Sequence, residues 1–523
     1  MKQRIVDVLI IGSGHAGGMA AKMLTEKGIS CLMLNAGPIA DIEKDTAHKA
    51  SYDLPYRGFR PPSRLSHVFQ SNEFNANVWV DEKEVPYTYD PEQPYNWVRV
   101  RLFGGRSLFW SRQSFRLSDY ELKGKSHDGF GEDWPISLAD LDPYYSKVEE
   151  IFRVSGRRDG IAQYPDGNFV PDTSPWTGSM QRLKTASEKM GIACCKQRRA
   201  MGVNGLASSV NLLLPKAFAS GKLKAIPNVV VRELTVGKNT GLVNGAHFVD
   251  RLTRREMSVK ARIIVLAAGT LESTRLLLNS KIANSSGVMG HYLIDQTYGV
   301  GITCSVPEAR GGKSSSTLMG GTALVPRFRN LGTKADGFLR GYAFNVSSQT
   351  GAMEPRCFAA YGEELQRKLD LYHGSGVSIG VMGEVLARYE HHVRINPNVV
   401  DAWDVPALHI ETKYTDNELN MSRDAVQTSI ALAESAGFEV LASNAIPNPP
   451  GYSIHELGTC RMGNDSKQSV LNKWNQSHDI KNLFVVDGSA FVSGGWQNPT
   501  MTILALAMRS SEYLAEQMRT GTV

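Results

Sequence analysis

Two residues near the end of the chain, His455 and Asn498, are of types that could handle a proton and a hydroxyl oxygen. A neutral imidazole is a suitable general base near pH 7. An amide can orient a hydroxyl group and stabilise negative charge that develops on its oxygen. Asn498 precedes Pro499 in SGGWQNPTMTILALAM, where polar residues meet the start of an apolar helix. A helix start carries unpaired N–H groups and a partial positive charge, so it suits an electron-rich ligand.

Both residues also have ordinary structural interpretations. A lone histidine is more often a satisfied core residue, and asparagine is a common helix N-cap. For Asn498 the two interpretations are compatible, because its backbone could end the cap while its amide faces a ligand. Gln497, next to Asn498, is the best polar candidate for binding a substrate.

The element that could position a cofactor lies at the start of the chain. Val6–Ile11 is a continuous apolar run, typical of a strand buried on both faces of a parallel sheet. A glycine-rich turn follows, then a helical pattern over 18–26 and a second strand over 29–34. In this context the turn predicts binding of a dinucleotide pyrophosphate at a helix N-terminus. The turn consists of Gly12, Ser13, Gly14, His15, Ala16 and Gly17.

The residue that ends the second strand is Asn35, in LMLNAGP. An acidic residue usually binds the adenosine ribose hydroxyls from this position. Asparagine still donates and accepts hydrogen bonds, but without the charge-assisted component. We therefore expect Asn35 to bind the ribose more weakly than a carboxylate would.

Later segments of the sequence indicate whether the cofactor is NAD or FAD. They are RLFGGRSLFWSRQSF (101–115), PNVVVRELTV, ARIIVLAAGTLESTRLLLNS (261–280) and LFVVDGS, followed by Asn498-Pro499-Thr500. This order of segments resembles the glucose–methanol–choline (GMC) family of flavin oxidoreductases from the first strand to the last helix. The resemblance implies FAD contacts from the glycine turn above, from the small-residue turn that includes Gly269, and from Gly104, Gly105, Ser107, Val231, Ala268, Asp487, Gly488, Asn498, Pro499 and Thr500.

The same resemblance assigns catalytic roles. The family motif HxxGTxRMG is matched by HELGTCRMG (455–463), and the family pairs this histidine with a second His or Asn. His455 would then take the hydroxyl proton while hydride passes to flavin N5, and Asn498 would orient the hydroxyl. The helix that starts near Pro499 would point at the flavin pyrimidine ring and stabilise negative charge on the reduced cofactor.

A further segment suggests the substrate. Asp133-Trp134-Pro135 followed by LxPYY (141–145) is similar to the sugar-oxidising branch that includes pyranose oxidases and glucoside 3-dehydrogenases. This implies FAD-dependent oxidation of a secondary hydroxyl, at C3 or C2 of a sugar or glycoside, to a keto-sugar. The alternatives are a non-sugar alcohol (a cyclitol, a sterol or a choline-like compound) and a flavoprotein subunit that serves electron relay. A sterol enzyme should carry a larger apolar lid.

Two departures from the family limit the expected cofactors. Some sugar oxidases link a histidine covalently to the flavin, but the nearest position here is Phe109, so we expect noncovalent FAD. Related sugar 3-dehydrogenases carry a cysteine-rich insertion for an iron–sulfur cluster. Here that region holds only Cys194 and Cys195, which cannot ligate a normal cluster. Electrons should therefore pass from FAD to oxygen or to an electron-acceptor protein, and we expect no metal site.

Composition excludes several other classes. The 523 residues are 42% hydrophobic and 21% charged, which are globular values, and the net charge of +6 is small for the length. No basic cluster with interleaved aromatics suggests nucleic acid. No apolar run approaches the ~18 residues of a membrane helix, and the apolar start is broken by Asp7. The sequence favours a soluble, cytoplasmic protein, periplasmic only if a small partner subunit carries it.

These elements predict an α/β fold with two domains. A discontinuous Rossmann-like FAD-binding domain should comprise 1–45, 96–115, 200–295 and 441–523. An α+β substrate domain with an antiparallel sheet should comprise 46–95, 116–199 and 296–440. Three stretches rich in aromatic and polar residues are candidates for sugar contact: SYDLPYRGFRPP (51–62), YDPEQPYNW (89–97) and RRDGIAQYPDGNF (157–169).

Overall fold

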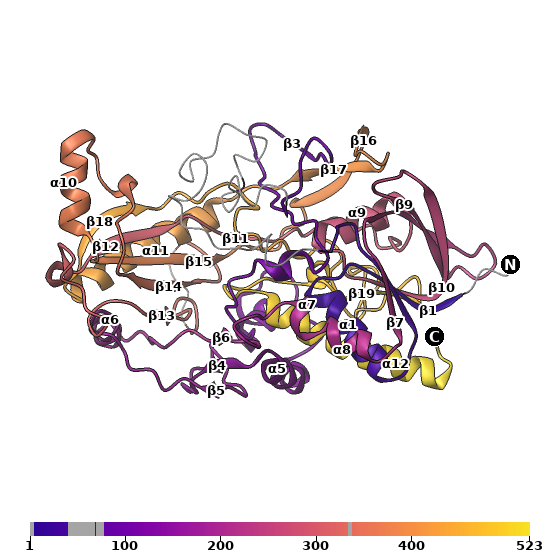
Figure 1. The fold of residues 1–523 in the computed structure, drawn as a ribbon, viewed down its shortest axis with the longest axis horizontal. Coiled ribbons are helices and arrows are strands. Elements are labelled where there is room, and N and C mark those ends of the chain that lie inside the picture. The colour runs from indigo at the N-terminus through magenta and orange to yellow at the C-terminus, as the bar shows by residue number, and fades with distance from the viewer. Residues whose placement is uncertain (1–4, 40–67, 69–77, 333–336) are drawn as a thin grey trace.

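The computed structural model describes residues 5–39, 68, 78–332 and 337–523, and its elements form two main sheets (Figure 1). The larger sheet has seven strands in the order β7-β2-β1-β10-β9-β8, with β19 beside β10. Its pairs from β7 to β10, and β10 with β19, are parallel, whereas β9 and β8 continue it as antiparallel strands. The strands are β1 (Val6–Ile11), β2 (Cys31–Leu34), β7 (Leu223–Ile226), β8 (Val229–Val236), β9 (Val243–Asp250), β10 (Glu256–Leu266) and β19 (Leu483–Val485).

The turn after β1 requires glycine for steric reasons. Gly12 has φ +104°, and a Cβ there would lie 2.2 Å from the carbonyl oxygen of Ala267 at the end of β10. A Cβ on Gly17 would lie 2.0 Å from the carbonyl oxygen of Gly12. These two glycines therefore let helix α1 (His15–Glu26) start directly against the strand ends. The helix begins three residues earlier than the sequence pattern suggested.

Helix α1 packs on the long C-terminal helix α12 (Thr500–Thr520), which in turn packs on α5 (Leu138–Phe152). The LxPYY segment makes the contact between α5 and α12, and the DWP segment binds the loop before α12. The Trp134 indole donates to Ser493 Oγ at 2.7 Å, and the Tyr145 hydroxyl lies 2.7 Å from Thr502 Oγ1. The last helix is thus fixed from both sides.

The packing of α5 bears on the expected domain boundaries. The sequence assigned 116–199 to the substrate domain, yet Leu117, Trp134, Phe152 and Val154 belong to the hydrophobic core of the seven-stranded sheet. The boundaries stay a prediction, with one change: we propose that 117–154 belong to the FAD-binding domain. All strands of the larger sheet lie within the segments assigned to that domain.

The second sheet has six antiparallel strands in the order β13-β14-β15-β12-β18, with β11 beside β15. Burial alternates along its strands. One face is apolar and packs on α11 (Asp416–Ser435) and α6 (Gly178–Lys189), while the other is half-buried. The strands are β11 (Gln296–Thr297), β12 (Gly301–Ser305), β13 (Thr322–Val325), β14 (Tyr342–Gln349), β15 (Gly376–Glu384) and β18 (Glu439–Asn444).

The half-buried face carries small polar side chains in register. Thr322 lies opposite Ser347, Ser347 opposite Ser378, and Ser378 opposite Thr303. Residues directly opposite one another point to the same face of a sheet. A row of four hydroxyl side chains therefore crosses this face, which we call the hydroxyl row.

Two smaller sheets and several short helices complete the described chain. Buried Arg275 of α9 (Thr270–Ser280) pairs with buried Asp401 at 2.9 Å, which joins α9 to the turn between β16 and β17. One small sheet contains β3 (Thr88–Tyr89), β16 (His392–Val400) and β17 (Pro406–Glu411). The other contains β4 (Val154–Gly156), β5 (Val170–Pro171) and β6 (Arg199–Ala200). The remaining helices are α3 (Asp119–Leu122), α4 (Gly124–Asp128), α7 (Ser209–Leu212), α8 (Leu214–Ala219), α10 (Gly362–Tyr372), η4 (Gly105–Leu108), η5 (Pro307–Ala309), η6 (Pro355–Cys357) and η7 (Gly488–Ala490).

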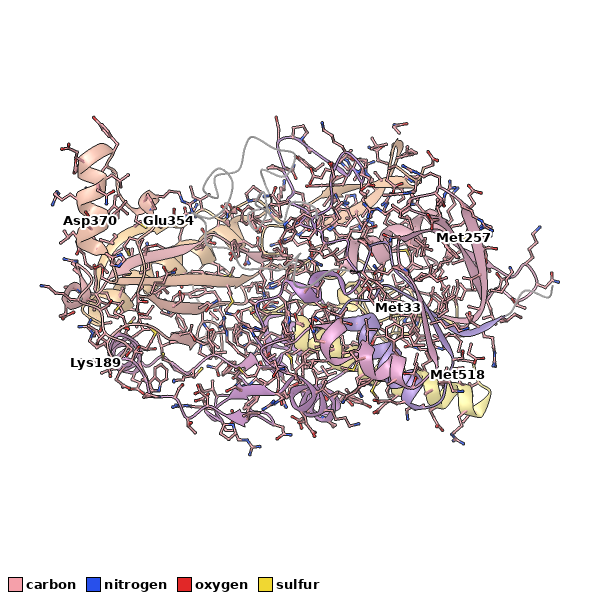
Figure 2. The ribbon with its side chains drawn as sticks, in the orientation of Figure 1. Met33, Lys189, Met257, Glu354, Asp370 and Met518 are labelled. Atoms are coloured by element: carbon pink, nitrogen blue, oxygen red, sulfur yellow. The ribbon has the colours of Figure 1, made fainter. Side chains whose placement is uncertain are left out.

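The two sheets occupy opposite ends of an elongated molecule, with both termini at the end of the larger sheet (Figure 1). Figure 2 places Met33 within that half, where it is fully buried, and Lys189, Glu354 and Asp370 at the far end. Within the described residues, no helix combines the length and apolar character needed to cross a membrane.

Candidate active site

A cavity of about 1170 Å³ is lined by residues of both sheets. Its walls come from the first glycine turn, the segment around Gly105, the start of α9, the strands β11, β12, β14 and β15, the His455 loop and the start of α12. It is large enough for a dinucleotide together with a second ligand.

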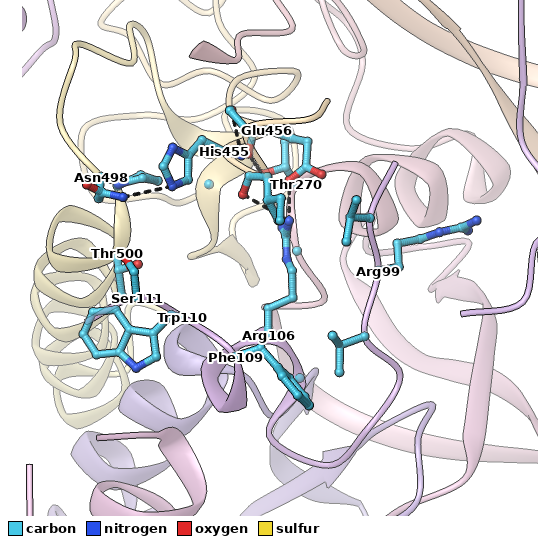
Figure 3. Close-up of a pocket in the computed structure, with 18 of the residues that line it drawn as sticks. Arg99, Arg106, Phe109, Trp110, Ser111, Thr270, His455, Glu456, Asn498 and Thr500 are labelled. Atoms are coloured by element: carbon cyan, nitrogen blue, oxygen red, sulfur yellow. Dashed lines mark hydrogen bonds and ion pairs between the residues drawn. The ribbon is translucent and has the colours of Figure 1, made fainter. Parts of the chain in front are cut away.

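His455 and Asn498 meet in this cavity (Figure 3). The Asn498 amide nitrogen Nδ2 lies 3.2 Å from His455 Nε2, and His455 Nδ1 lies 2.8 Å from Gln296 Oε1. Burial, together with the positive charge of Arg106, lowers the pKa of His455 to about 4. The imidazole is therefore neutral at physiological pH and can accept a proton.

Asn498 does not cap the last helix. Helix α12 begins at Thr500, its N-cap position is Pro499, and no side chain caps it. The Asn498 amide faces His455 instead, and its Oδ1 is buried without a hydrogen-bond partner. An unpartnered buried acceptor beside a cavity indicates that a ligand completes its hydrogen bonding.

The glycines around the cavity test whether the cofactor site fits a dinucleotide. A Cβ on Gly14 would come no closer than 3.9 Å to another residue, and the same holds for Gly105. A Cβ on Gly269 would meet nothing within 4 Å. Side chains at these places would project into free space beside the cavity lining, where a pyrophosphate must approach the backbone closely. The arrangement fits FAD.

Most residues expected to contact FAD line the cavity, whereas Gly17 and Gly104 do not. Gly17 packs on Gly12, as described above, and a Cβ on Gly104 would lie 2.8 Å from the side chain of Val210. Both glycines therefore serve packing. The expected residues that do line the cavity are Gly12, Ser13, Gly14, His15, Ala16, Asn35, Gly105, Ser107, Val231, Ala268, Gly269, Asp487, Gly488, Asn498, Pro499 and Thr500.

Asn35 lines the cavity, but its amide is engaged within the protein. Its Oδ1 accepts from Ser13 Oγ at 2.8 Å, and its Nδ2 donates to the carbonyls of Gly37 and Leu102. Ser13 Oγ also accepts from the Gly104 amide at 2.7 Å. Asn35 thus links the first glycine turn to the turn at Gly104. Ribose binding by Asn35 stays a prediction.

Asp487 organises a third turn of the cofactor site. Its Oδ2 accepts from the Gly269 amide at 3.0 Å and from Ser273 Oγ at 2.5 Å, and its Oδ1 accepts from Ser489. Burial raises the pKa of this carboxyl group, against the effect of these hydrogen bonds. Asp487 therefore holds the α9 turn next to the start of η7.

The structure places Gln497, the expected substrate contact, outside the cavity, and substrate binding by Gln497 stays a prediction. This residue is fully buried and is absent from the cavity lining. Its side-chain oxygen lies beside Gly495, and neither its Oε1 nor its Nε2 has a hydrogen-bond partner within the described residues. The neighbour of a site residue therefore need not share its site.

Three groups of lining residues were missed by sequence reasoning. Gln296 contacts His455, as described. Arg106 donates to Glu456 Oε2 at 2.6 Å and to the carbonyl of Ile454, so it holds the His455 loop from the opposite wall (Figure 3). The hydroxyl row also lines the cavity. A glutamine outside any motif and polar residues spread over four strands carry no local signal.

The remaining residues singled out from the sequence differ in whether they line the cavity. Residues 51–62 lie outside the described chain. Trp97 of the second aromatic stretch and Phe109 line the cavity, whereas no residue of 157–169 does. Burial raises the pKa of Cys194 to about 12 and that of Cys195 well above its usual value, so both are protonated thiols.

Two family models match the chain. The GMC oxidoreductase model covers residues 390–507, which include the His455 loop and Asn498. The FAD-binding domain model covers residues 5–42, which include β1, the glycine turn and β2. The matched regions thus both contribute residues to one cavity.

Similar proteins of full length are known. A 2-methyl-1,2-propanediol dehydrogenase of Mycolicibacterium austroafricanum is 26% identical over 98% of this chain and 95% of its own. The fructose dehydrogenase large subunit of Gluconobacter japonicus is 25% identical over 98% of each chain. The crystal structure of pyridoxine 4-oxidase from Mesorbium loti shares the fold, with a TM-score of 0.65, 19% identity and coverage of 97% of this chain and 99% of that one.

The cavity geometry, the two family models and the full-length similarity agree with one another. The family's cofactor is FAD, and the residues around the cavity fit that cofactor. The chain therefore carries a GMC oxidoreductase domain and an FAD-binding domain, and it is an FAD-dependent oxidoreductase that acts on CH–OH groups.

Proposed function

We propose that this enzyme oxidises a secondary hydroxyl, at C3 or C2 of a sugar or glycoside, to a keto-sugar. The observation that carries the proposal is the pairing of His455 Nε2 with Asn498 Nδ2 in a cavity that is also lined by the hydroxyl row. A base, an amide donor and a polar wall are together what selective oxidation of one hydroxyl among several requires.

The two catalytic residues act on one substrate oxygen. His455 accepts the hydroxyl proton at Nε2, which is uncharged at neutral pH. Asn498 donates through Nδ2 to the same oxygen and stabilises the negative charge that develops there. FAD, when bound, supplies the two-electron acceptor for the hydride that leaves the carbon.

The substrate wall supports a polyhydroxylated ligand. Thr303, Ser347 and Ser378 of the hydroxyl row are only half-buried, and Asn345 lies beside them on the same face. Hydroxyl and amide groups both donate and accept, so they match sugar hydroxyls, and Trp97 offers an aromatic surface on the cavity wall. An apolar sterol would leave these groups unpaired, which is costly.

A second candidate is a smaller non-sugar alcohol. It is favoured by the relative named as a 2-methyl-1,2-propanediol dehydrogenase. A short diol would fill less of the polar wall than a sugar. The two candidates therefore differ in whether substitutions on the hydroxyl row change KM.

The electron acceptor and the partners are also part of the proposal. We infer that electrons leave FAD to oxygen or to an acceptor protein. The relative named as a large subunit supports a small partner subunit for this chain. We place the enzyme in the cytoplasm, or in the periplasm if that subunit carries it.

The test is anaerobic absorbance spectroscopy of the purified protein with a panel of sugars, glycosides and short diols. We expect a sugar or glycoside to bleach the flavin band and His455→Ala to slow bleaching by about 10²–10⁴-fold, because the base is lost. The His392→Ala variant, which changes a histidine outside the cavity, is the matched control.

Either of two results would reject the proposal. Bleaching by diols alone would favour the second candidate. An undiminished rate in His455→Ala would remove His455 as the base. Readmitting air then distinguishes an oxidase from a dehydrogenase, because only an oxidase regains its flavin band rapidly.

A further inference from the structure

We propose that Gln296 is a positioning residue that fixes which nitrogen of His455 carries the proton and, through it, which way the Asn498 amide faces. The inference rests on the proposed function, in that His455 is taken as the base. It concerns a residue that belongs to no motif of the sequence. Gln296, His455 and Asn498 form a chain of hydrogen bonds with a single allowed direction.

The orientation of the Gln296 amide is forced by its surroundings. Its Nε2 lies 2.9 Å from the carbonyl oxygen of Gly495 and 2.9 Å from that of Gln497. Carbonyl oxygens only accept, so the nitrogen must face them. The side chain is 2% exposed, and a flipped amide would set its oxygen against two buried acceptors.

This orientation decides the tautomer of His455. With its nitrogen committed, Gln296 presents Oε1 to His455 Nδ1 at 2.8 Å. An amide oxygen only accepts, so Nδ1 must carry the hydrogen. The neutral imidazole then has its lone pair on Nε2, the nitrogen that faces Asn498. The proton-accepting atom of the base is thereby chosen before any substrate arrives.

The tautomer of His455 in turn fixes the orientation of the Asn498 amide. A lone pair on His455 Nε2 requires a donor, so Nδ2 of Asn498 must face it at 3.2 Å. Asn498 Oδ1 is then left unpartnered within the protein. Gly495 and Gln497 belong to the same loop as Asn498. The chain of hydrogen bonds therefore starts and ends on one loop and passes through Gln296 and His455.

The backbone around Gln296 is held by the loop that it serves. Neighbouring Asp295 accepts from the Gly451 amide at 2.6 Å and from Ser453 Oγ, four and two residues before His455. Ile294 and Leu457 exchange backbone hydrogen bonds at 2.9 Å, beyond His455. Segment 294–296 thus clamps the His455 loop on both sides, and Gln296 itself pairs with Glu384 of β15.

Other charged groups lie nearby but do not set the tautomer. Arg106 and Glu456 form their own pair, and Glu384 pairs with Arg340. Asp295 is occupied by Gly451 and Ser453, and the Tyr414 hydroxyl donates to the Gln296 backbone carbonyl. In the hydrogen bonds of the described chain, the partner of His455 Nδ1 is Gln296. Substitution of Gln296 therefore leaves these other groups in place.

The test compares Gln296→Met, which removes the acceptor at similar size, with Gln296→Glu, which restores a carboxyl oxygen. We expect Gln296→Met to lower kcat by roughly 10²-fold with little change in KM, as expected when a base is held in the wrong tautomer. Gln296→Glu should retain kcat within about tenfold, because a protonated carboxyl group can donate to the Gly495 or Gln497 carbonyl and still accept from His455 Nδ1 through its other oxygen. Gln366→Met, on the surface helix α10, is the matched control.

A direct readout does not depend on folding of a variant. Nitrogen NMR of wild-type protein labelled at histidine reports the tautomer, and His455 is assigned by the signal missing in His455→Gln. The inference predicts a proton on Nδ1 near neutral pH. A proton on Nε2, or a Gln296→Met enzyme with wild-type kcat, would overturn it. If His455→Ala turned over normally while Nδ1 carried the proton, the proposed function would fail and the positioning would stand.

Discussion

The basicity of His455 is set by its surroundings. Burial and Arg106 lower its pKa to about 4, so it stays neutral where an exposed histidine would begin to charge. Gln296 directs the lone pair to the cavity, and Asn498 supplies a donor beside it. Three uncharged side chains thus form the site that we propose handles one proton.

This arrangement predicts the pH dependence of the reaction. Only the neutral imidazole accepts a proton, so kcat/KM should fall as the pH drops through about 4 and should be flat from about 5 to 7. The measurement is kcat/KM across this range in a series of buffers. Because a histidine buried in its neutral form also disfavours folding in acid, circular dichroism at each pH should verify that the enzyme is folded. An acid limb near 6.5 would contradict the buried, unprotonated base.

Sequence reasoning singled out His455 and Asn498, whose side chains lie 3.2 Å apart in the structure, because both lie in motifs whose residue types match a chemical role. It missed Gln296, since nothing in LIDQTYG distinguishes a positioning glutamine from an ordinary one. The contact arises when β11 pairs with β15 and the His455 loop folds over it. Sequence reasoning chose Gln497 by adjacency alone, and in the structure that side chain is fully buried and lies outside the cavity lining.

At the scale of the secondary-structure elements, glycine has two different roles in the turns that face the cavity. Gly12 and Gly17 allow the close approach of backbone to backbone. Gly14 has an ordinary φ of −64°, and its Cβ position is open. A methyl group there would therefore leave the fold intact and obstruct a phosphate near the start of α1.

We therefore expect Gly14→Ala to fold normally but to bind FAD at least about tenfold more weakly, a loss of ~1.4 kcal/mol. The measurement is the FAD bound per protein after gel filtration, together with a fluorescence titration. Gly351→Ala is the control, since Gly351 is exposed, has no positive φ and would meet nothing within 4 Å. Full retention of FAD by Gly14→Ala would show that the turn does not approach the pyrophosphate.

The first strand and the parallel half of the larger sheet could be predicted because continuous apolar runs mark buried strands. Val6–Ile11 has the expected bounds. The place of α5 could not be predicted, because its partner α12 lies about 350 residues further along the chain. Local pattern identifies an amphipathic helix but does not say which core it covers.

In the molecule as a whole, the cavity is walled by elements of both sheets, so a ligand there contacts two cores at once. FAD should therefore stabilise the entire fold. A ligand that binds only the folded state adds about 2.7 kcal/mol at 100 times its Kd.

The thermal unfolding midpoint should consequently rise when FAD is added to the stripped protein, in a single transition. The measurement is calorimetry across a series of FAD concentrations, with Gly14→Ala as the matched variant that should shift less. Two transitions, of which FAD moves only one, would show that the halves unfold independently.

The six-stranded sheet divides its two faces between different tasks. The apolar face packs on α11 and α6, while the hydroxyl row on the other face lines the cavity. Changes to Thr303, Ser347 or Ser378 therefore need not disturb the packing that keeps the sheet folded. Such a wall is open to laboratory evolution: a library confined to these positions should alter which alcohols are accepted while most of its members remain folded.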